Sequence, residues 1–330
     1  MSHRVRKTSV SRLGLAPAGG SQWAVVGSVS AAESTHARYT AAAVELPTLG
    51  LLVANDGVIA ALVVAHRSIP LPLLVVAFAV CGAMHMSLQH EALHGHPTPY
   101  QWLNELLVTV PSFIWLSFPA YRDSHRLHHR VELTHPQADP ESFYVDQQTW
   151  DRSSRLWRAV LVANRTLLGR MLMWPVVAMA RGIWSLLRAA GRTWRGLLAL
   201  AGHALATWAT LWLVTVAGGV PWWVFAVGFI YGGLSLTYLR SFAEHLAVAD
   251  GVPSAMVRTN WFWSTLFLNN NLHHAHHAAP NVAWYRLPQT AEILHSDQRA
   301  AAGAGLYLGY IEVARRHLVH PFSQPVHPYR

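Results

Sequence analysis

The histidines of this chain gather in short clusters whose spacing suits a metal site. The clusters read HEALHGH at residues 90–96, HRLHH at 125–129 followed by THP at 134–136, and HHAHH at 273–277, and His245 follows an acid in RSFAEH. Neutral imidazole is the commonest metal ligand, and spacings of i, i+3 and i+4 place side chains on one face of a helix. Three such faces, far apart in the sequence, can converge on one metal centre.

Nine of these histidines have the spacing expected of metal ligands. They are His90, His94, His125, His128, His129, His245, His273, His276 and His277. One metal ion takes four to six ligands, so nine imidazoles predict two ions with positions left open for oxygen. The roles of His96, His135 and His274 stay open, although on a regular helix His274 points about 100° away from its neighbour.

The composition predicts an integral membrane protein. Of the 330 residues, 52% are hydrophobic and 12% are charged, which is about half the charged fraction of a soluble domain. Four apolar runs, residues 49–65, 70–88, 197–217 and 222–242, are long enough to cross a bilayer as helices. A further run, residues 103–120, is interrupted by proline and is expected to dip into the bilayer and return. The predicted fold is all-α, with about four transmembrane helices plus interfacial helices.

Positive charge is concentrated between Trp150 and Gly196, where nine arginines accompany one acid, Asp151. Tryptophan and leucine alternate with these arginines, a pattern typical of a helix lying on an anionic membrane surface. No recognition motif for nucleic acid is present, so nucleic acid is not an expected partner. The predicted outer loops carry only Arg67 as a basic residue. The positive-inside rule therefore places both termini and a cap of histidine boxes on the cytoplasmic side of the cytoplasmic membrane.

The chain is expected to divide into three parts. Residues 1–44 mix serine, glycine, alanine and arginine without a period and are predicted to be a mobile basic tail. Residues 45–295 form the expected catalytic domain in the membrane, and residues 296–330 form a C-terminal helix and tail. The single cysteine, Cys81, excludes an internal disulfide and a cysteine-based zinc or iron–sulfur site. Any metal site must then depend on imidazoles.

The clusters resemble the histidine boxes of the membrane fatty-acid desaturase family. The resemblance is carried by HEALH, HRLHH and NNNLHHAHHAAPNVAWYRLP (269–288), in the family's order, and it covers roughly residues 50 to 290. It implies a di-iron centre, oxygen as co-substrate and two external electrons. It also implies that the histidines named above hold the irons, with His245 in the place of an extra ligand that some members have. No HPGG haem-binding motif is present, so a separate donor, ferredoxin or a b-type cytochrome with its reductase, is expected.

The function predicted on this basis is desaturation of a lipid acyl chain. Iron supplies both the redox steps and the oxygen binding that cleavage of an unactivated C–H bond requires. The apolar spans are expected to enclose a narrow tunnel that leads to the irons. A hydroxylase or ketolase, acting for example on a carotenoid, is the alternative on the same scaffold, because these reactions share the first hydrogen abstraction. HEALH also matches the HExxH pattern of zinc hydrolases, so a zinc-dependent membrane hydrolase is a less favoured alternative, as is a non-enzymatic metal binder.

Acidic and amide side chains near the boxes are expected to support the imidazoles. An acceptor on the second ring nitrogen fixes the tautomer of a metal-binding histidine. The candidate acids are Glu91, Asp123, Glu132, Asp139, Glu141 and Glu244. Asn269, Asn270 and Asn271 precede the third box, where one of them is expected either to hold a metal-bound water or to cap a helix.

Overall fold

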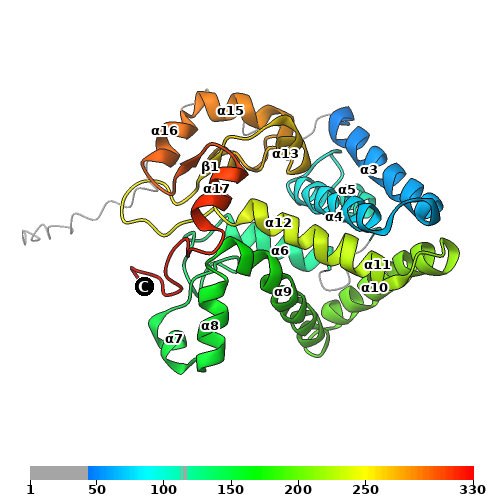
Figure 1. Cartoon of the computed structure of the whole chain (residues 1–330), viewed down its shortest axis with the longest axis horizontal. Helices are drawn as coiled ribbons and strands as arrows, with labels where there is room; N and C mark the ends of the chain where they lie inside the picture. Colours follow the sequence, from blue (N-terminus) through cyan, green and yellow to red (C-terminus); the bar gives the residue numbers. More distant parts are fainter. Residues whose placement is uncertain (1–43, 112, 114–116) are drawn as a thin grey trace, which may run out of the picture.

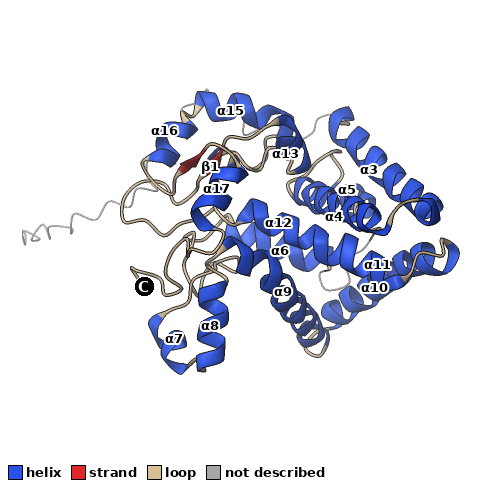
Figure 2. Cartoon of the chain, in the orientation of Figure 1, coloured by secondary structure: helices blue, strands red, loops and turns tan. Residues whose placement is uncertain are grey.

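The structure, a computed structural model, describes residues 44–111, 113 and 117–330. Helices dominate the described residues, and the short parallel strands β1 (Met256–Val257) and β2 (Leu306–Tyr307) form a two-stranded sheet (Figure 2). The predicted all-α fold is confirmed. The tail predicted at residues 1–44 lies outside the described residues except for Val44.

Four helical segments are long and apolar enough to cross a membrane, as predicted. They are α3 (Leu46–Ala65), α4 (Leu71–Leu93), α10 (Trp194–Leu211) continued by the π-helical η2 (Trp212–Ala217), and a last segment made of α11 (Trp222–Phe225), the π-helical η3 (Ala226–Gly232) and α12 (Gly233–Ser241). The chain is thus a multi-pass membrane protein. Helix α4 continues to Leu93 rather than ending at Leu88, so the first box begins inside the last turns of a spanning helix.

Glycines allow α4 to lie very close to the last spanning segment. A Cβ atom on Gly82 would lie 2.2 Å from the carbonyl oxygen of Phe229, and a Cβ atom on Gly233 would lie 2.8 Å from the Cα atom of Gly82. Both distances are too short for a larger residue, so a side chain at either position would push the helices apart. This close packing fixes the first box, at the end of α4, relative to Glu244 and His245, which follow α12.

The arginine-rich segment folds into successive helices rather than one. They are α7 (Gln147–Arg152), α8 (Arg155–Ala163), α9 (Leu167–Ala190) and the start of α10. Side-chain caps set these boundaries, because Ser154 accepts a hydrogen bond from the first turn of α8, Thr166 from that of α9 and Thr193 from that of α10. Helix α9 packs against α10 and α12 (Figure 1). Most of its arginines are exposed, but Arg170 is buried.

The remaining helices are short. They are η1 (His66–Ser68), α5 (Gln101–Leu107), α6 (Phe118–His128), α13 (Trp261–Leu266), α14 (His273–Ala278), η4 (Trp284–Arg286), α15 (Leu287–Ile293), α16 (Ser296–Ala301) and α17 (Tyr310–His317). The second box forms the last turns of α6, and the third box is α14 itself. The run expected to dip into the bilayer contains α5 and the start of α6, while residues 112 and 114–116 within it lie outside the described residues.

The C-terminal segment is packed against the part of the chain that carries the boxes. Strand β2 pairs with β1, which leads toward the third box. The side chain of Arg165 hydrogen bonds to Ser323, and the hydroxyl of Thr134, just after the second box, lies 3.1 Å from Nε2 of His327. Residues 296–330 therefore help to hold the surroundings of the histidines in place.

Candidate metal centre

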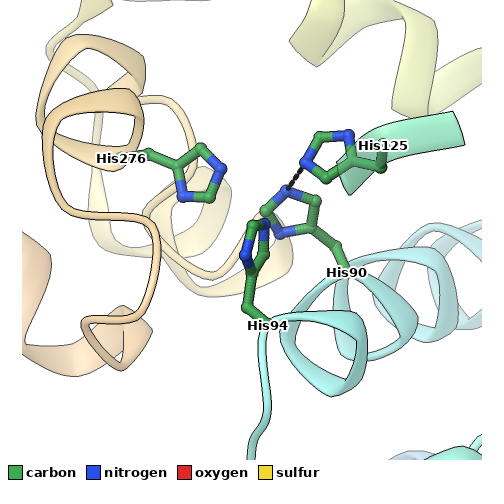
Figure 3. A group of neighbouring side chains, drawn as sticks. All are labelled: His90, His94, His125 and His276. Carbon is green, nitrogen blue, oxygen red and sulfur yellow. Dashed lines mark hydrogen bonds between the residues drawn. The ribbon is translucent and has the colours of Figure 1, made fainter. Parts of the chain in front are cut away.

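Eight of the nine predicted histidines form two groups in which the ligand nitrogens all lie within 4.8 Å of one another. The first group is His90, His94, His125 and His276, and the second is His128, His245, His273 and His277. Figure 3 shows the rings of the first group pointing toward one another from α4, α6 and α14. Each group thus combines residues from distant parts of the sequence.

The ninth histidine, His129, lies between the two groups. Its Nε2 atom is 3.0 Å from Nε2 of His125 and 3.1 Å from Nε2 of His276, both in the first group. Its ring also stacks on that of His277, in the second group, with 4.3 Å between centroids. The structure therefore brings all nine predicted histidines together, five around the first position and four around the second.

The distances between ring nitrogens suit metal coordination. Two imidazole nitrogens that bind one ion at ~2.1 Å and at right angles to each other lie about 3.0 Å apart. The Nε2 atoms of His90 and His125 are 3.0 Å apart, and Nε2 of His245 is 2.9 Å from that of His273 and 3.1 Å from that of His128. Among the described residues, the buried Nε2 atom of His94 has no hydrogen-bond partner. The residues present therefore fit a pair of imidazole-bound metal ions.

The protein environment favours the neutral form of several of these rings. Burial, together with the neighbouring imidazoles, lowers the pKa of His129 to about 2 and that of His245 to about 3. The same causes lower the pKa values of His273, His276 and His277 well below the ordinary value. A neutral imidazole keeps a lone pair available for a metal, so the rings are ready to bind at neutral pH.

Three of the six candidate acids contact box histidines. Nδ1 of His128 lies 2.7 Å from Oδ1 of Asp139, and Nδ1 of His125 lies 3.0 and 3.1 Å from the two carboxylate oxygens of Glu141. With Nδ1–H donated to these acids, Nε2 of each ring is directed toward the other histidines. Oε1 of Glu244 lies 3.4 Å from Nδ1 of His273.

The other three acids serve different contacts. Asp123 pairs with Arg122, and Glu132 pairs with Arg330. Glu91 accepts a hydrogen bond from the backbone N–H of Trp284. In the described part of the chain, these contacts do not link the three acids to the predicted ligand histidines, unlike the contacts of Asp139, Glu141 and Glu244.

Asn270 has a role that the sequence left undecided. Its side-chain oxygen lies 3.1 Å from Nδ1 of His273, so it can fix the tautomer of this ring as a carboxylate would. The neighbouring amides bind backbone instead, Asn269 to the carbonyl of Trp284 and Asn271 to that of Val257. These contacts tie the approach to the third box to η4 and to β1.

His96, His135 and His274 belong to neither group. Nδ1 of His274 hydrogen bonds to the hydroxyl of Ser296 at 2.8 Å, in agreement with its expected direction on the helix. Nδ1 of His135 accepts hydrogen bonds from two backbone N–H groups in the turn that follows it. His96 lies 2.9 Å from Oε1 of Glu45. Each of these residues supports local structure.

The contact between His96 and Glu45 belongs to a set of linked contacts that the sequence pattern did not reveal. This set, here called the latch, consists of Glu45, Thr48, Glu91, His96 and Trp284. Burial opposes a charge on His96, but the hydrogen bond to Glu45 and the nearby Glu91 outweigh it and raise the pKa of the ring. Trp284 completes the latch, since its backbone N–H donates to Glu91 and its indole N–H donates to Thr48. The latch connects the start of α3, the first box and the loop after the third box. The sequence contained His96 in HEALHGH and Trp284 in NVAWYRLP, but it gave no sign of which residues they would contact.

A cavity of about 380 Å³ adjoins the second histidine group. Its wall includes His128, His245 and His273, and it extends along α9 and α12. Most of the surface of this wall is apolar, and charged and polar side chains interrupt it near the histidines. The narrow tunnel expected from the sequence stays a prediction. The wall also includes Arg165 and Arg170, which the sequence analysis had assigned to a surface helix.

The fold and the site together define a multi-pass membrane protein with two histidine groups that can each hold a metal ion. The sequence matches the family model named fatty acid desaturase over residues 68–308, more than half of the chain. The chain belongs to the fatty acid desaturase family, and this membership makes it an enzyme of the oxidoreductase class. No curated protein matches the sequence.

Proposed function

We propose that this protein is a membrane-bound di-iron oxidoreductase that uses oxygen and two electrons from a separate donor to desaturate a lipid acyl chain. The observation that carries the proposal is the sorting of the predicted histidines into two groups, one of them enlarged by His129. The donor is expected to be ferredoxin or a b-type cytochrome with its reductase. Iron bound by these groups would supply oxygen binding and the electron transfers needed to cleave a C–H bond.

The chain's own residues have defined tasks in this proposal. The box histidines would hold the irons, while Asp139 and Glu141 contact Nδ1 of His128 and of His125 and leave Nε2 of each ring free for a metal. Asn270 does the same for His273. Because these partners are buried or half-buried, the rings keep one orientation through the reaction.

The zinc-hydrolase alternative is disfavoured by the position of Glu91. In the HExxH pattern the glutamate acts as the general base beside a metal-bound water. Here the Glu91 carboxylate accepts a hydrogen bond from the N–H of Trp284 and belongs to the latch with His96. It is therefore poorly placed to activate water at the histidines.

Hydroxylation is the second candidate, because the mainly apolar cavity also carries polar side chains beside the second group. A cavity lined by arginines, acids and tyrosines beside the second group suits a substrate region that carries polar groups. The two reactions differ in product mass, since desaturation removes two hydrogens and hydroxylation adds one oxygen.

Iron content and product mass test the proposal. Protein purified without oxygen is expected to contain iron, at about two ions per chain when fully loaded, as nine imidazoles require. Lipids of a host that expresses the chain are expected to contain an oxygen-dependent product that a His129→Ala variant does not form. Mass spectrometry then separates desaturation from hydroxylation. Stoichiometric zinc together with hydrolytic activity would refute the redox function.

The proposed orientation places the histidine boxes on the cytoplasmic side, in line with the positive charge of the arginine-rich segment. In a Cys81→Ser background, a single cysteine at Arg67 is expected to react with an impermeant maleimide added to intact cells. A single cysteine at the exposed Arg130, directly after the second box, is expected to react only after the cells are opened. The reverse labelling pattern would show that the proposed orientation is inverted.

A further inference from the structure

Two arginines are buried in the wall of the cavity beside the second histidine group. The exposed fractions of Arg165 and Arg170 are 2% and 1%, and both line the cavity together with His128 and His245. Burial of a charged side chain is costly unless an opposite charge or a full set of hydrogen bonds accompanies it. A guanidinium group does not lose its proton in proteins, so it cannot avoid this cost by becoming neutral.

Neither guanidinium has a carboxylate partner within 4.0 Å among the described residues. Arg165 donates to the hydroxyl of Ser323, and its buried Nε atom has no partner in the described part of the chain. Arg170 donates from Nε to the carbonyl oxygen of Asn164 at 3.0 Å. These neutral acceptors leave the positive charge of the pair uncompensated.

The carboxylates in the same wall are engaged elsewhere. Asp139 and Glu141 accept hydrogen bonds from box histidines. The carboxylate of Glu244 lies 2.5 Å from Nη1 of Arg240, at the end of α12. These acids therefore make no direct ion pair with Arg165 or Arg170 in the described part of the chain, and an anionic group from outside the chain would supply the direct partner that the two arginines lack.

Aromatic rings hold the two guanidinium groups in position. The central carbon of Arg165 lies 4.3 Å from the ring centroid of Tyr144, and that of Arg170 lies 3.5 Å from the ring centroid of Phe143. Stacking covers a face of each guanidinium and leaves edge donors for a planar or tetrahedral oxyacid group. Burial, and then the charge of Arg165, lowers the pKa of Arg170 well below its ordinary value, which reflects the same uncompensated charge.

Along α9 the wall of the cavity combines apolar side chains with Arg181 and Ser185. Trp174, Ala178 and Leu186 follow Arg170 along this helix and line the same cavity. From Arg170 to Leu186 the helix extends about 24 Å, which is enough for a hydrocarbon chain. An amphiphile is therefore the kind of molecule that this cavity fits.

We propose that Arg165 and Arg170 bind the anionic oxyacid group, a carboxylate or a phosphate, of an amphiphilic substrate whose hydrocarbon part lies along α9. The inference rests on the proposed function, because it assigns the anion to the substrate of that reaction. The same cavity reaches His245 and His273, so a substrate bound by the two arginines would share one cavity with the second histidine group.

Binding to iron-loaded protein in a neutral detergent, under argon, tests this site. Isothermal titration calorimetry is expected to show binding of dodecyl phosphate or dodecanoate, with much weaker binding of dodecanol and of inorganic phosphate. Arg170→Gln is expected to weaken binding of the anionic amphiphile by about thirtyfold or more, because it removes a buried charge-assisted partner. Arg188→Gln is the matched control, since Arg188 is exposed on the same helix and outside the cavity.

Several results would overturn the site. They are equal affinity for dodecanol, affinity for inorganic phosphate as high as for dodecyl phosphate, or unchanged binding in Arg170→Gln. If Arg170→Gln does not purify in a folded form, Arg170→Lys is expected to bind roughly tenfold more weakly, because it keeps the charge and loses the planar fork. The titration needs neither oxygen nor electrons, so it is independent of turnover. Anion binding without any oxidised product would refute the proposed function and leave the binding site standing.

Discussion

Replacement of His277 by alanine is expected to reduce turnover by about a hundredfold or more, because it removes a nitrogen from the second histidine group. The same replacement at His274, in the same six-residue helix, is expected to leave most of the turnover intact. Nε2 of His277 lies 3.1 Å from Nε2 of His273, whereas Nδ1 of His274 binds Ser296. The measurements are iron per chain and the rate of oxygen-dependent product formation.

The cost of His274→Ala falls on stability instead. A buried hydrogen bond to Ser296 is lost, and an unpartnered hydroxyl in a buried position costs ~1 to 3 kcal/mol. Thermal unfolding separates this effect from loss of metal. If folded, membrane-inserted His274→Ala is as inactive and as iron-poor as His277→Ala, the assignment of the third box is wrong in register.

Replacement of Asp139 by asparagine is expected to reduce metal affinity or turnover by about ten- to a hundredfold. Burial opposes a charge on His128, but Glu141 and Asp139 outweigh it and raise the pKa of the ring, which makes its Nε2 a stronger metal ligand. Asp139 also accepts from the backbone N–H groups of Thr134 and Glu141, so an amide in its place loses acceptors that orient the loop. After a chelator challenge, iron is expected to fall toward one ion per chain, since His128 belongs to the second group.

Asp123→Asn is the matched control for this prediction. Asp123 lies in the same helix as the second box, but its carboxylate is 69% exposed and pairs with Arg122. Its replacement is expected to change neither iron content nor turnover. Equal effects of the two replacements would show that the change at Asp139 acts through general charge rather than through His128. Unchanged iron retention in Asp139→Asn would contradict the proposal that Asp139 supports His128 as a metal ligand.

Local sequence patterns were sufficient for the spanning helices and for the candidate ligands. Apolar runs of this length bury their backbone hydrogen bonds only as helices, so their number could be read from composition. Spacings of three and four residues place His125, His128 and His129 near one another within α6 and its end, whatever the rest of the chain does. The direction of His274 followed from the same helical geometry.

The division of the histidines between two metal positions depended on the tertiary structure. His128 and His129 are neighbours in the sequence, yet Nε2 of His128 lies next to His245 and Nε2 of His129 next to His125 and His276. Which ring joins which group depends on how α4, α6 and α14 meet. No spacing within one box contains that information.

The sequence by itself determined the residue types, the helical faces that they share and the membrane character of the chain, because these follow from interactions between near neighbours. Only the tertiary structure decided that Asp139 and Glu141 serve the boxes while Glu91 does not, and that Arg165 and Arg170 enter a cavity rather than lie on a surface. The physical reason is that partners for buried charges and imidazoles come from segments far apart in the chain. Their pairing is fixed by packing, such as the contact of Gly82 with Gly233, and not by local periodicity.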